Sequence, residues 1–509
     1  MSRSVNTKRN IIWGLFQKIL SVLLPFFVRT ALIYSLGVEY VGLNSLFVSI
    51  LSVLSLAELG FASAVAYSMY KPIAEDDKDA VLQLLHFFRN VYRVIGVSIL
   101  VAGLIAMPFL DYLVEGAKPD DVNLQIAFGV YLLNTVISYL ACGYRQTLLD
   151  AHQRNDVVSK VGTAMCAVVN ILQICLLMLV PSYYLFIAVL PLFTVVQNIV
   201  ISQLSNRLFP EYCARNFKGK SLDKATRKAI GKRVMGIMVY RTCQTTRDAC
   251  DSIFISFFLG LTAVACYSNY FLIVSSLLAI LEVICSSMTA SVGNSIASES
   301  PQKNFKDMRL LMFLYSVVAT ILLACLLCLY QLFMILWLGP DLLLPDSIVI
   351  LLCVYYYVRV VGDIRSVYVD AAGLWWHLKG RSIIEAVMNI VLNFILIQHI
   401  GVAGAVLATI ISMLLVNYLW GSEVVFSRYF KNGKLHVFFA DNGVYALVAI
   451  LACAASYAVC ATFGDIGWIW FVVKGLVAIC VSSAVILLLF CRTERFKEAK
   501  AFIINNVIS

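Results

Sequence analysis

The chain has 509 residues, of which 61% are hydrophobic and 13% are charged, and its formal net charge is +10. Soluble proteins carry about 25% charged residues, so this composition excludes a soluble enzyme and indicates a protein that crosses a membrane many times. The positive residues gather in short loops between apolar segments, which argues against a nucleic-acid-binding surface.

Apolar segments of spanning length recur along the whole chain. A helix needs about 20 apolar residues to cross a bilayer, and by this measure we predict about fourteen transmembrane helices. Continuous runs of Leu, Ile, Val and Ala favour helices over a barrel, whose strands would alternate. The sequence therefore predicts an all-α polytopic membrane protein. The predicted spans are 11–36, 43–69, 91–114, 122–143, 157–180, 183–206, 234–259, 262–292, 310–336, 347–370, 380–399, 402–426, 440–463 and 467–491.

Lysine and arginine are distributed unevenly over the loops. Most of the 39 Lys and Arg lie at the two termini and in alternate loops, whereas the opposite loops contain little beyond Lys118. Positively charged loops remain on the cytoplasmic side, so we expect both termini to be cytoplasmic. The most basic loop, 207–233, includes a stretch that can lie as an amphipathic helix on anionic lipids of the inner leaflet.

The first two predicted spans each carry a charge deep in an apolar segment. Arg29 follows Pro25 in the first span, and Glu58 lies in the second. A charge at the bilayer centre costs at least ~2.5–3.5 kcal/mol, so such residues are functional candidates by default. Glu58 can be a proton site, a partner of Arg29 or one half of a structural pair.

The span 234–259 is the most heavily charged one. It contains Arg241, Arg247, Asp248 and Asp251 near its middle. At 100° per residue Arg241 and Asp248 share a face, while Arg247 and Asp251 are one turn apart and close enough to pair. We expect these side chains to face a protein interior or a wet cavity rather than lipid.

The span 347–370 is the second charged one. Arg359 and Asp363 are one turn apart on one face, and Arg365 is offset from them. In the following span, Glu385 and Asn389 share a face. The alternative to a ligand site is that these charges simply pair between helices.

Arginine outnumbers the other charged residues inside the spans. Guanidinium groups bind phosphate oxygens bidentately, so this excess predicts an anionic ligand, above all a diphosphate. The predicted substrate-binding residues are Arg29, Arg241, Arg247, Arg359 and Arg365. The predicted ion-coupling or charge-pairing residues are Glu58, Asp248, Asp251, Asp363 and Glu385.

Motifs of catalysis and metal binding are absent from the sequence. No P-loop, GxSxG or HExxH motif occurs. Cys325 and Cys328 form a CxxC, but it lies inside the apolar run LLACLLCLY, which is typical of core packing. We therefore predict a transporter without catalytic residues, metal or cofactor, other than a coupling ion such as H⁺ or Na⁺.

Two stretches in the first two-thirds of the chain resemble the Wzx-like polysaccharide flippases, within the multidrug/oligosaccharidyl-lipid/polysaccharide exporter superfamily. The stretch SLGVEYVGLNSLFVSILSVLSLAELGF is similar to the family's opening. Family members tend to have a Lys ten residues before an Asp, and here Arg241 and Asp251 take these places, in a stretch that continues CDSIFISFFLGL. Arg247 and Asp248 are not part of the family's pattern.

A third stretch also resembles this family. It reads AAGLWWHLKGRSIIEAVMNIVLNFILIQHIGVAGAVLATIIS, and Glu385, Asn389, Gly401 and Gly404 match the pattern of an acid, an amide and a Gly-rich helix entry. The resemblance implies two six-helix lobes that form a V-shaped central cavity, plus two accessory C-terminal helices. The corresponding ranges are 1–206 for the N-lobe, 207–233 for a basic cytoplasmic linker, 234–428 for the C-lobe and 429–509 for the accessory helices and tail.

The resemblance also implies a function. It implies translocation of undecaprenyl-diphosphate-linked oligosaccharide across a bacterial plasma (inner) membrane by alternating access, coupled to an ion gradient. O-antigen, capsule, exopolysaccharide and teichoic-acid substrates are not separated, and polysaccharide polymerase machinery is an expected partner. One alternative is a multidrug or organic-cation antiporter of the same superfamily, which would prefer an acidic cavity. Another is a membrane glycopolymer ligase or polymerase, which would need a larger outer loop.

Overall fold

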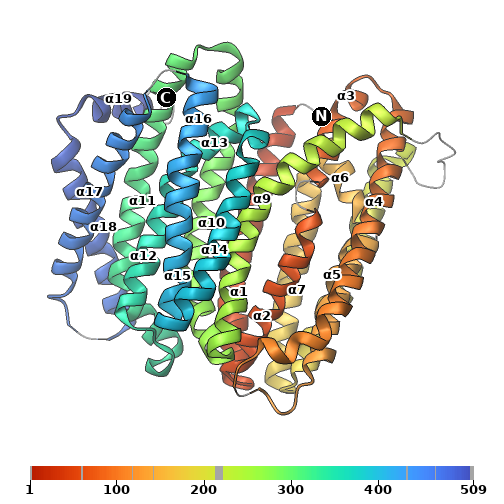
Figure 1. The fold of residues 1–509 in the computed structure, drawn as a ribbon, viewed down its shortest axis with the longest axis horizontal. Helices are drawn as coiled ribbons and strands as arrows, with labels where there is room; N and C mark the ends of the chain where they lie inside the picture. Colours follow the sequence, from red (N-terminus) through yellow and green to blue (C-terminus); the bar gives the residue numbers. More distant parts are fainter. Residues whose placement is uncertain are drawn as a thin grey trace. The chain divides into compact units, whose positions relative to one another are not determined.

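The structure is a computed structural model, and it describes residues 3–58, 61–116, 118–141, 143–212, 222–431, 434–464 and 466–504. Within these ranges every regular element is a helix (Figure 1). Eleven helices are long and apolar enough to cross a membrane, or twelve if the bent pair α5 (Leu124–Leu140) and α6 (Tyr144–Ala151) is one span. The predicted fold class, an all-α polytopic membrane protein, is confirmed.

The predicted number of about fourteen spans is approximately matched, and the difference has a physical cause. α2 (Val38–Leu54) is apolar but has only 17 residues. α9 (Lys224–Leu259) is long, with 36 residues, but charged side chains interrupt its apolar surface. These two helices fall in the predicted spans 43–69 and 234–259.

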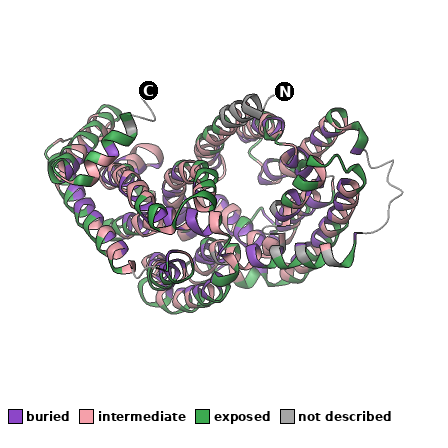
Figure 2. Cartoon of the chain, turned by 90° about the horizontal axis from the view of Figure 1, so that it is seen from above, coloured by how far each residue is buried: buried purple, intermediate pink, exposed green. Residues whose placement is uncertain are grey.

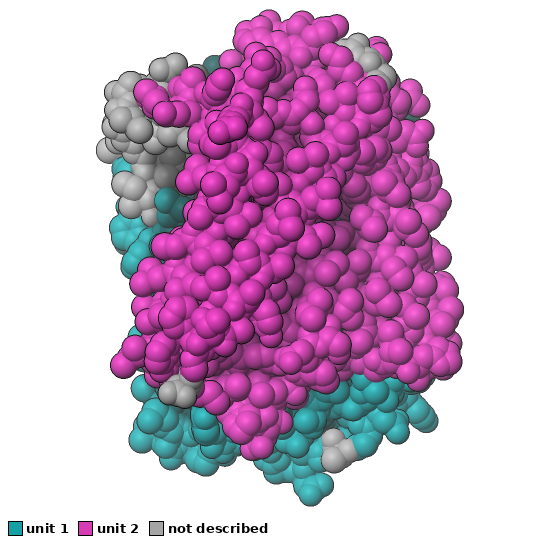
Figure 3. All heavy atoms as spheres, turned by 90° about the vertical axis from the view of Figure 1, so that its left-hand side faces the viewer, with its two compact units in different colours: residues 1–265 teal, residues 266–509 magenta. Residues whose placement is uncertain are grey.

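The chain divides into two compact units, residues 1–265 and residues 266–509 (Figure 3). Seen end-on, the helices of both units carry buried residues on one side and exposed residues on the other (Figure 2). The predicted arrangement of two lobes around a central cavity stays a prediction. The helices of unit 1, besides α2, α5, α6 and α9, are α1 (Arg3–Ser35), η1 (Ser55–Glu58), α3 (Phe61–Ala74), α4 (Lys78–Ala106), η2 (Met107–Leu113), α7 (Asn155–Leu179), α8 (Tyr183–Leu208) and η3 (Pro210–Tyr212).

In unit 1, α1 packs along α7, and α5 packs between α4 and α8. The aromatic rings of Phe47, Phe128 and Tyr131 form part of the core, with ring centroids 5.4 and 5.7 Å from that of Phe47. These side chains come from α2 and α5. The packing holds the polar residues of these two helices at fixed positions.

α9 belongs to unit 1 because it packs against α2 and α3. Its last turn is also tied to the loop after η2, since Ser256 Oγ donates to the Leu113 carbonyl at 2.7 Å and Glu115 N donates to the Ser256 carbonyl at 3.1 Å. A Cβ on Gly42 of α2 would lie 2.1 Å from the Leu261 carbonyl oxygen, so only glycine permits this approach. The predicted lobe boundary at 207–233 stays a prediction.

Unit 2 contains the remaining helices, and α10 begins just before its boundary. They are α10 (Leu261–Ser298), α11 (Pro301–Leu338), η5 (Pro340–Leu342), α12 (Asp346–Val361), α13 (Asp363–Ala372), α14 (Trp375–Ile400), α15 (Val402–Ser412), η6 (Met413–Trp420), α16 (Gly421–Val425), η7 (Phe426–Phe430), α17 (Leu435–Cys460), α18 (Trp468–Phe490) and α19 (Glu494–Ile503).

Two glycines make the tight α14–α15 hairpin. Gly401 has a φ of 59°, in the region that favours glycine. A Cβ on Gly404 would lie 2.4 Å from the carbonyl carbon of Leu396, so a side chain there would push the two helices apart. Both are positions that carry the family resemblance.

The helix that follows this hairpin changes its winding. η6 and η7 are π-helical, and the α-helical segment α16 lies between them. A π-helical segment breaks the regular pattern of backbone hydrogen bonds, and such segments often occur at functional sites. Here the change exposes carbonyl oxygens of η6 to a side chain from α13.

The helices α17, α18 and α19 lie side by side with α11 at one edge of unit 2 (Figure 1). Asp441 of α17 holds the tail helix α19, because it accepts from Arg495 at 2.7 Å and from Arg309 of α11 at 2.7 Å. These three side chains tie the C-terminal helices to the rest of unit 2.

Candidate functional site

A cavity of about 530 Å³ lies within unit 1, between α1, α2, α5, α7 and α8. Arg29 lines it from α1, where Pro25 interrupts the helical hydrogen bonds four residues earlier. The lining residues are Pro25, Val28, Arg29, Asn44, Val48, Leu51, Ser52, Ser55, Tyr131, Asn134, Thr135, Asn170, Gln173, Phe186 and Leu190.

The charge of this lining has one sign. Arg29 is the only lysine, arginine or carboxylate among the described residues that line the cavity. The other polar groups are amides and hydroxyls. A cavity without a carboxylate offers no counter-charge to an organic cation, whereas a guanidinium favours an anion.

The four amide side chains of the cavity each form a hydrogen bond to the protein. On α7, Gln173 Nε2 donates to the Phe186 carbonyl at 3.0 Å, and Asn170 Nδ2 donates to the Cys166 carbonyl at 2.7 Å. On α5, Asn134 Oδ1 accepts from Thr194 at 2.7 Å.

The fourth amide belongs to α2, where Asn44 Oδ1 accepts from the Tyr131 hydroxyl. The sequence interpretation did not identify any of these amides. Their signal is a neutral polar side chain inside an otherwise apolar span, which is weaker than a charge.

Glu58 ends η1, at a break in the predicted span 43–69. Its carboxylate accepts a hydrogen bond from Tyr92 at 2.9 Å and another from the Tyr139 hydroxyl. Both oxygens therefore have a tyrosine donor, from α4 and α5 respectively. Three roles were predicted for Glu58: a proton site, a partner of Arg29 and one half of a structural pair. The observed arrangement agrees with the structural pair, in which tyrosines are the partners.

The four charges of α9 lie on two faces of the helix. Arg241 and Asp248 are exposed, so the prediction that they face a protein interior or a wet cavity stays a prediction. Arg247 and Asp251 are each only 2% exposed. Arg247 Nε lies 3.4 Å from Asp248 Oδ1, at the edge between the two faces. Burial of the Arg247 guanidinium agrees with the expectation that these charges avoid lipid.

A second charged cluster lies where α12 ends and α13 begins. Arg359 Nη1 donates to Asp363 Oδ1 at 2.8 Å, across one helical turn. The Tyr315 hydroxyl of α11 donates to Asp363 Oδ2 at 2.7 Å. The predicted pair of Arg359 and Asp363 is present, and a tyrosine joins it.

Arg365 is 3% exposed and binds the backbone of η6. Its Nη1 donates to the carbonyls of Asn417 at 2.5 Å and Tyr418 at 3.3 Å, and its Nη2 donates to Asn417 Oδ1 at 2.6 Å. Both terminal nitrogens of the guanidinium thus have protein acceptors. The π-helical winding of η6 supplies the two carbonyls.

Glu385 completes this buried network. It lies 3.1 Å from Arg381 Nη1, and its Oε1 accepts from Asn417 Nδ2 at 3.3 Å. Arg381 was not among the predicted site residues, although its spacing of one turn before Glu385 is the ordinary signal of a helical ion pair. Asn417 gave no comparable signal.

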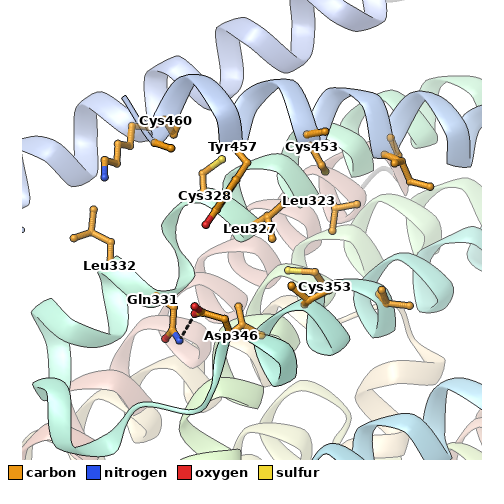
Figure 4. A pocket seen from close by; sticks show the side chains of 18 of the residues that line it. Leu323, Leu327, Cys328, Gln331, Leu332, Asp346, Cys353, Cys453, Tyr457 and Cys460 are labelled. Carbon is orange, nitrogen blue, oxygen red and sulfur yellow. Dashed lines mark hydrogen bonds between the residues drawn. The ribbon is translucent and has the colours of Figure 1, made fainter. Parts of the chain in front are cut away.

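A larger, apolar cavity of about 920 Å³ lies in unit 2 between α11, α12, α17 and the start of α18. Leu323, Leu327 and Cys328 of α11 line it, opposite Cys453 and Tyr457 of α17 (Figure 4). Its charged groups are Asp346, which accepts from Gln331 Nε2 at 2.9 Å, and Lys474 of α18.

The cysteines do not form a metal site within the part of the chain that the structure describes. Cys325 and Cys328 both carry free thiols and are half-buried. No group of three His, Cys, Asp or Glu side chains in the described ranges could hold a metal ion.

Comparison with solved structures identifies proteins that have a similar fold. No protein-family model matches the sequence, and no curated protein sequence matches it. Solved structures do match. An inward-facing multidrug resistance MATE family transporter of the MOP superfamily has a TM-score of 0.63 and 16% identity, over 82% of this chain and 96% of that one.

Two further structures extend this likeness. Lipid II flippase MurJ in an inward closed conformation has a TM-score of 0.64 and 16% identity, over 94% of this chain and 98% of that one. The Vibrio cholerae MATE transporter VcmN has a TM-score of 0.57 and 13% identity, over 86% of this chain and 99% of that one. The chain therefore has the fold shared by these MATE transporters and MurJ.

Proposed function

We propose that this protein is a flippase that moves a lipid-linked oligosaccharide with a diphosphate linkage, of the undecaprenyl type, to the outer leaflet of a bacterial plasma membrane. The observation that carries the proposal is the unit 1 cavity, whose lining contains Arg29 and no carboxylate among the described residues. An anion would neutralise Arg29, and its oxygens match the guanidinium fork.

The apolar cavity of unit 2 supports the lipid part of the proposal. Its walls are mainly Leu, Ile, Val, Ala and Cys side chains, so they offer a surface for a long hydrocarbon chain. Apolar cavities of this kind bury a hydrocarbon without leaving polar groups unsatisfied. We propose that this cavity takes a hydrocarbon chain, in keeping with the predicted lipid-contacting role of the C-terminal helices.

The predicted arginines take different roles in this proposal. Arg29 and the exposed Arg241 bind the anionic headgroup, and Arg359 contributes if it exchanges Asp363 for a phosphate. Arg365 positions η6, because both of its Nη atoms already donate to protein groups. Arg247 is buried beside Asp248 and orients that face of α9.

Transport by alternating access, coupled to H⁺ or Na⁺, remains part of the proposal. Asp248, Asp251, Asp363 and Glu385 are the proposed coupling or charge-pairing residues, together with Glu58. Anionic inner-leaflet lipids are the proposed contact of the basic loop at 207–233, of which residues 213–221 lie outside the described residues and 224–233 form the first part of α9. Export of an anion is favoured by ~2.3 kcal/mol per charge per 100 mV in a cell that is negative inside.

A multidrug transporter is the second candidate, because multidrug MATE transporters have a similar fold. The two candidates differ in the charge of the transported molecule. Purified full-length protein in proteoliposomes should translocate undecaprenyl-diphosphate-linked oligosaccharide and should not drive ethidium efflux. Ethidium efflux without glycan-lipid translocation would replace the first proposal by the second.

Cells offer a complementary test. A deletion strain should accumulate lipid-linked glycan on the inner leaflet, and Arg241→Ala or Arg359→Ala should abolish glycan export while membrane insertion stays normal. Arg93→Gln is the matched control, since Arg93 is an exposed side chain of α4 outside the cavity lining. Full export by both variants, together with Arg29→Ala, would contradict an arginine-dependent mechanism.

A further inference from the structure

The unit 1 cavity contains more polar groups than binding of a diphosphate requires. Besides Arg29 its lining holds four amides and four hydroxyls. These are Asn44, Asn134, Asn170, Gln173, Ser52, Ser55, Tyr131 and Thr135. Such groups suit a ligand that can both donate and accept hydrogen bonds.

The orientation of the two α7 amides is determined by the backbone. Gln173 Nε2 and Asn170 Nδ2 donate to carbonyl oxygens, and a carbonyl can only accept. The nitrogen of each amide is therefore held against the protein. Their other ends, Gln173 Oε1 and Asn170 Oδ1, are acceptors on the α7 wall of the cavity.

The other two amides are paired with hydroxyl groups. Asn44 Oδ1 accepts from Tyr131 and Asn134 Oδ1 accepts from Thr194. A hydroxyl can also accept, so either end of these two amides can turn toward a ligand. The cavity thus has acceptors on α7, and amides that can donate or accept on α2 and α5.

This pattern separates classes of ligand. A phosphate or carboxylate has only acceptors, so it would leave Gln173 Oε1 and Asn170 Oδ1 without a donor. A hydrocarbon would leave the cavity end of all four amides without a partner. A sugar hydroxyl both donates and accepts, and an N-acetyl group offers one N–H and one C=O. Neutral sugars therefore complement both kinds of wall.

We propose that the unit 1 cavity is a binding site for a neutral hexose or N-acetylhexosamine unit of the transported glycan, which these four amides contact, with the diphosphate at Arg29. This inference rests on the proposed function, because it takes the sugar to arrive on a diphosphate lipid. The inference goes beyond the proposed function because it specifies which kind of sugar the cavity binds.

The test compares two lipids on purified full-length protein in nanodiscs. One is undecaprenyl diphosphate, and the other is undecaprenyl diphosphate carrying N-acetylglucosamine. The wild-type protein should bind the sugar-bearing lipid at least about 10-fold more tightly. Gln173→Met and Asn134→Leu should each reduce this preference about 3- to 10-fold, the effect of losing one hydrogen bond. Neither should change the affinity for the sugar-free lipid.

Two controls accompany these variants. Gln203→Met makes the same chemical change on an exposed side chain of α8 and should leave the preference intact. Arg29→Gln should weaken binding of both lipids by a similar factor, because the diphosphate is common to them. Asn170→Ala, at a half-buried side chain, replaces Gln173→Met if that variant lowers the yield of folded protein.

The possible failures are distinguishable. Equal binding of the two lipids by the wild-type protein would overturn the sugar site and leave the flippase proposal standing. A sugar preference that survives the double variant Asn134→Leu/Gln173→Met would also overturn the sugar site. No binding of either lipid above that of phosphatidylglycerol would overturn the flippase proposal itself.

Discussion

The cavity of unit 1 and the buried network of unit 2 both contain arginine inside a membrane-spanning region, but the two arginines have different surroundings. Arg29 lines a cavity of about 530 Å³. Arg365 lies against η6, where Asn417 and Tyr418 accept from its Nη atoms. The hydrogen bonds of Arg365 fix η6 and so stabilise the fold, whereas Arg29 lies where a ligand in the cavity can reach it.

The comparison also concerns the neutral polar residues near each arginine. In unit 2, Asn417 binds both Arg365 and Glu385, so it connects two of the three charged residues of a buried network. In unit 1, each cavity amide has one end bonded to the protein and the other end on the cavity wall. A polar group on the wall of a cavity can therefore contact a ligand, whereas a polar group inside the network of unit 2 serves the fold.

The largest effect on folding is expected for Arg365→Leu. The change removes hydrogen bonds to a charged group, each contributing ~1.5–3 kcal/mol, and leaves the carbonyls of η6 unsatisfied. We expect little folded protein after extraction in detergent, as measured by size-exclusion chromatography and thermal unfolding. A normal yield and a normal thermal stability of Arg365→Leu would contradict the structural role that we assign to Arg365 in contrast to Arg29.

The next largest effect is expected for Arg29→Gln, but on transport rather than stability. Loss of a charged hydrogen bond to a phosphate should lower glycan-lipid translocation in proteoliposomes by about 10-fold or more. The melting temperature should fall less than it does for Arg365→Leu. Arg29→Lys should restore part of the rate if charge alone matters, and none if the fork geometry is needed.

An intermediate effect is expected at Arg359 and Asp363, where the pair is partly accessible. Arg359→Gln leaves the Asp363 carboxylate with Tyr315 as its remaining described hydrogen-bond donor, so stability should fall. The double variant Arg359→Gln/Asp363→Asn should be more stable than Arg359→Gln alone, which a double-mutant cycle in thermal unfolding measures. Strict additivity of the two changes would show that the pair is not coupled.

A smaller effect is expected for Gly421→Ala, which tests how tightly the unit 2 network is packed. A Cβ there would lie 2.8 Å from Arg365 Nη1, so the guanidinium would have to shift. Overpacking of this kind costs ~1–3 kcal/mol. The melting temperature should fall, and Gly443→Ala, where a Cβ meets no atom within 4 Å, is the matched control.

The smallest effect is expected at His152, which lies outside both regions. Its ring packs against Phe209 with the ring centroids 4.0 Å apart, and burial lowers the pKa of the imidazole. The unfolded chain then binds the proton more readily, so stability should decrease as the pH falls through about 6.5. The variant His152→Gln should lack this decrease, which thermal unfolding measured over a range of pH values would show.

Much of the fold follows from the sequence by itself. The lengths and composition of the apolar segments determine the membrane-spanning helices, because a helix must satisfy its own backbone in lipid. The pairing of Arg359 with Asp363 and the hairpin at Gly401 and Gly404 are local, so spacing and glycine positions are sufficient to predict them. The avoidance of lipid by Arg247 and Asp251 also follows from their charge alone.

Only the tertiary structure decides which arginine can reach a ligand. Arg29 and Arg365 have the same side chain, and the sequence indicates the same role for both. Their difference lies in the neighbours that the fold brings from distant segments, namely the amides of α2, α5 and α7 around one and the π-helical η6 around the other. Helix periodicity describes faces of a single helix, whereas a cavity or a satisfied donor depends on what the opposing helices supply.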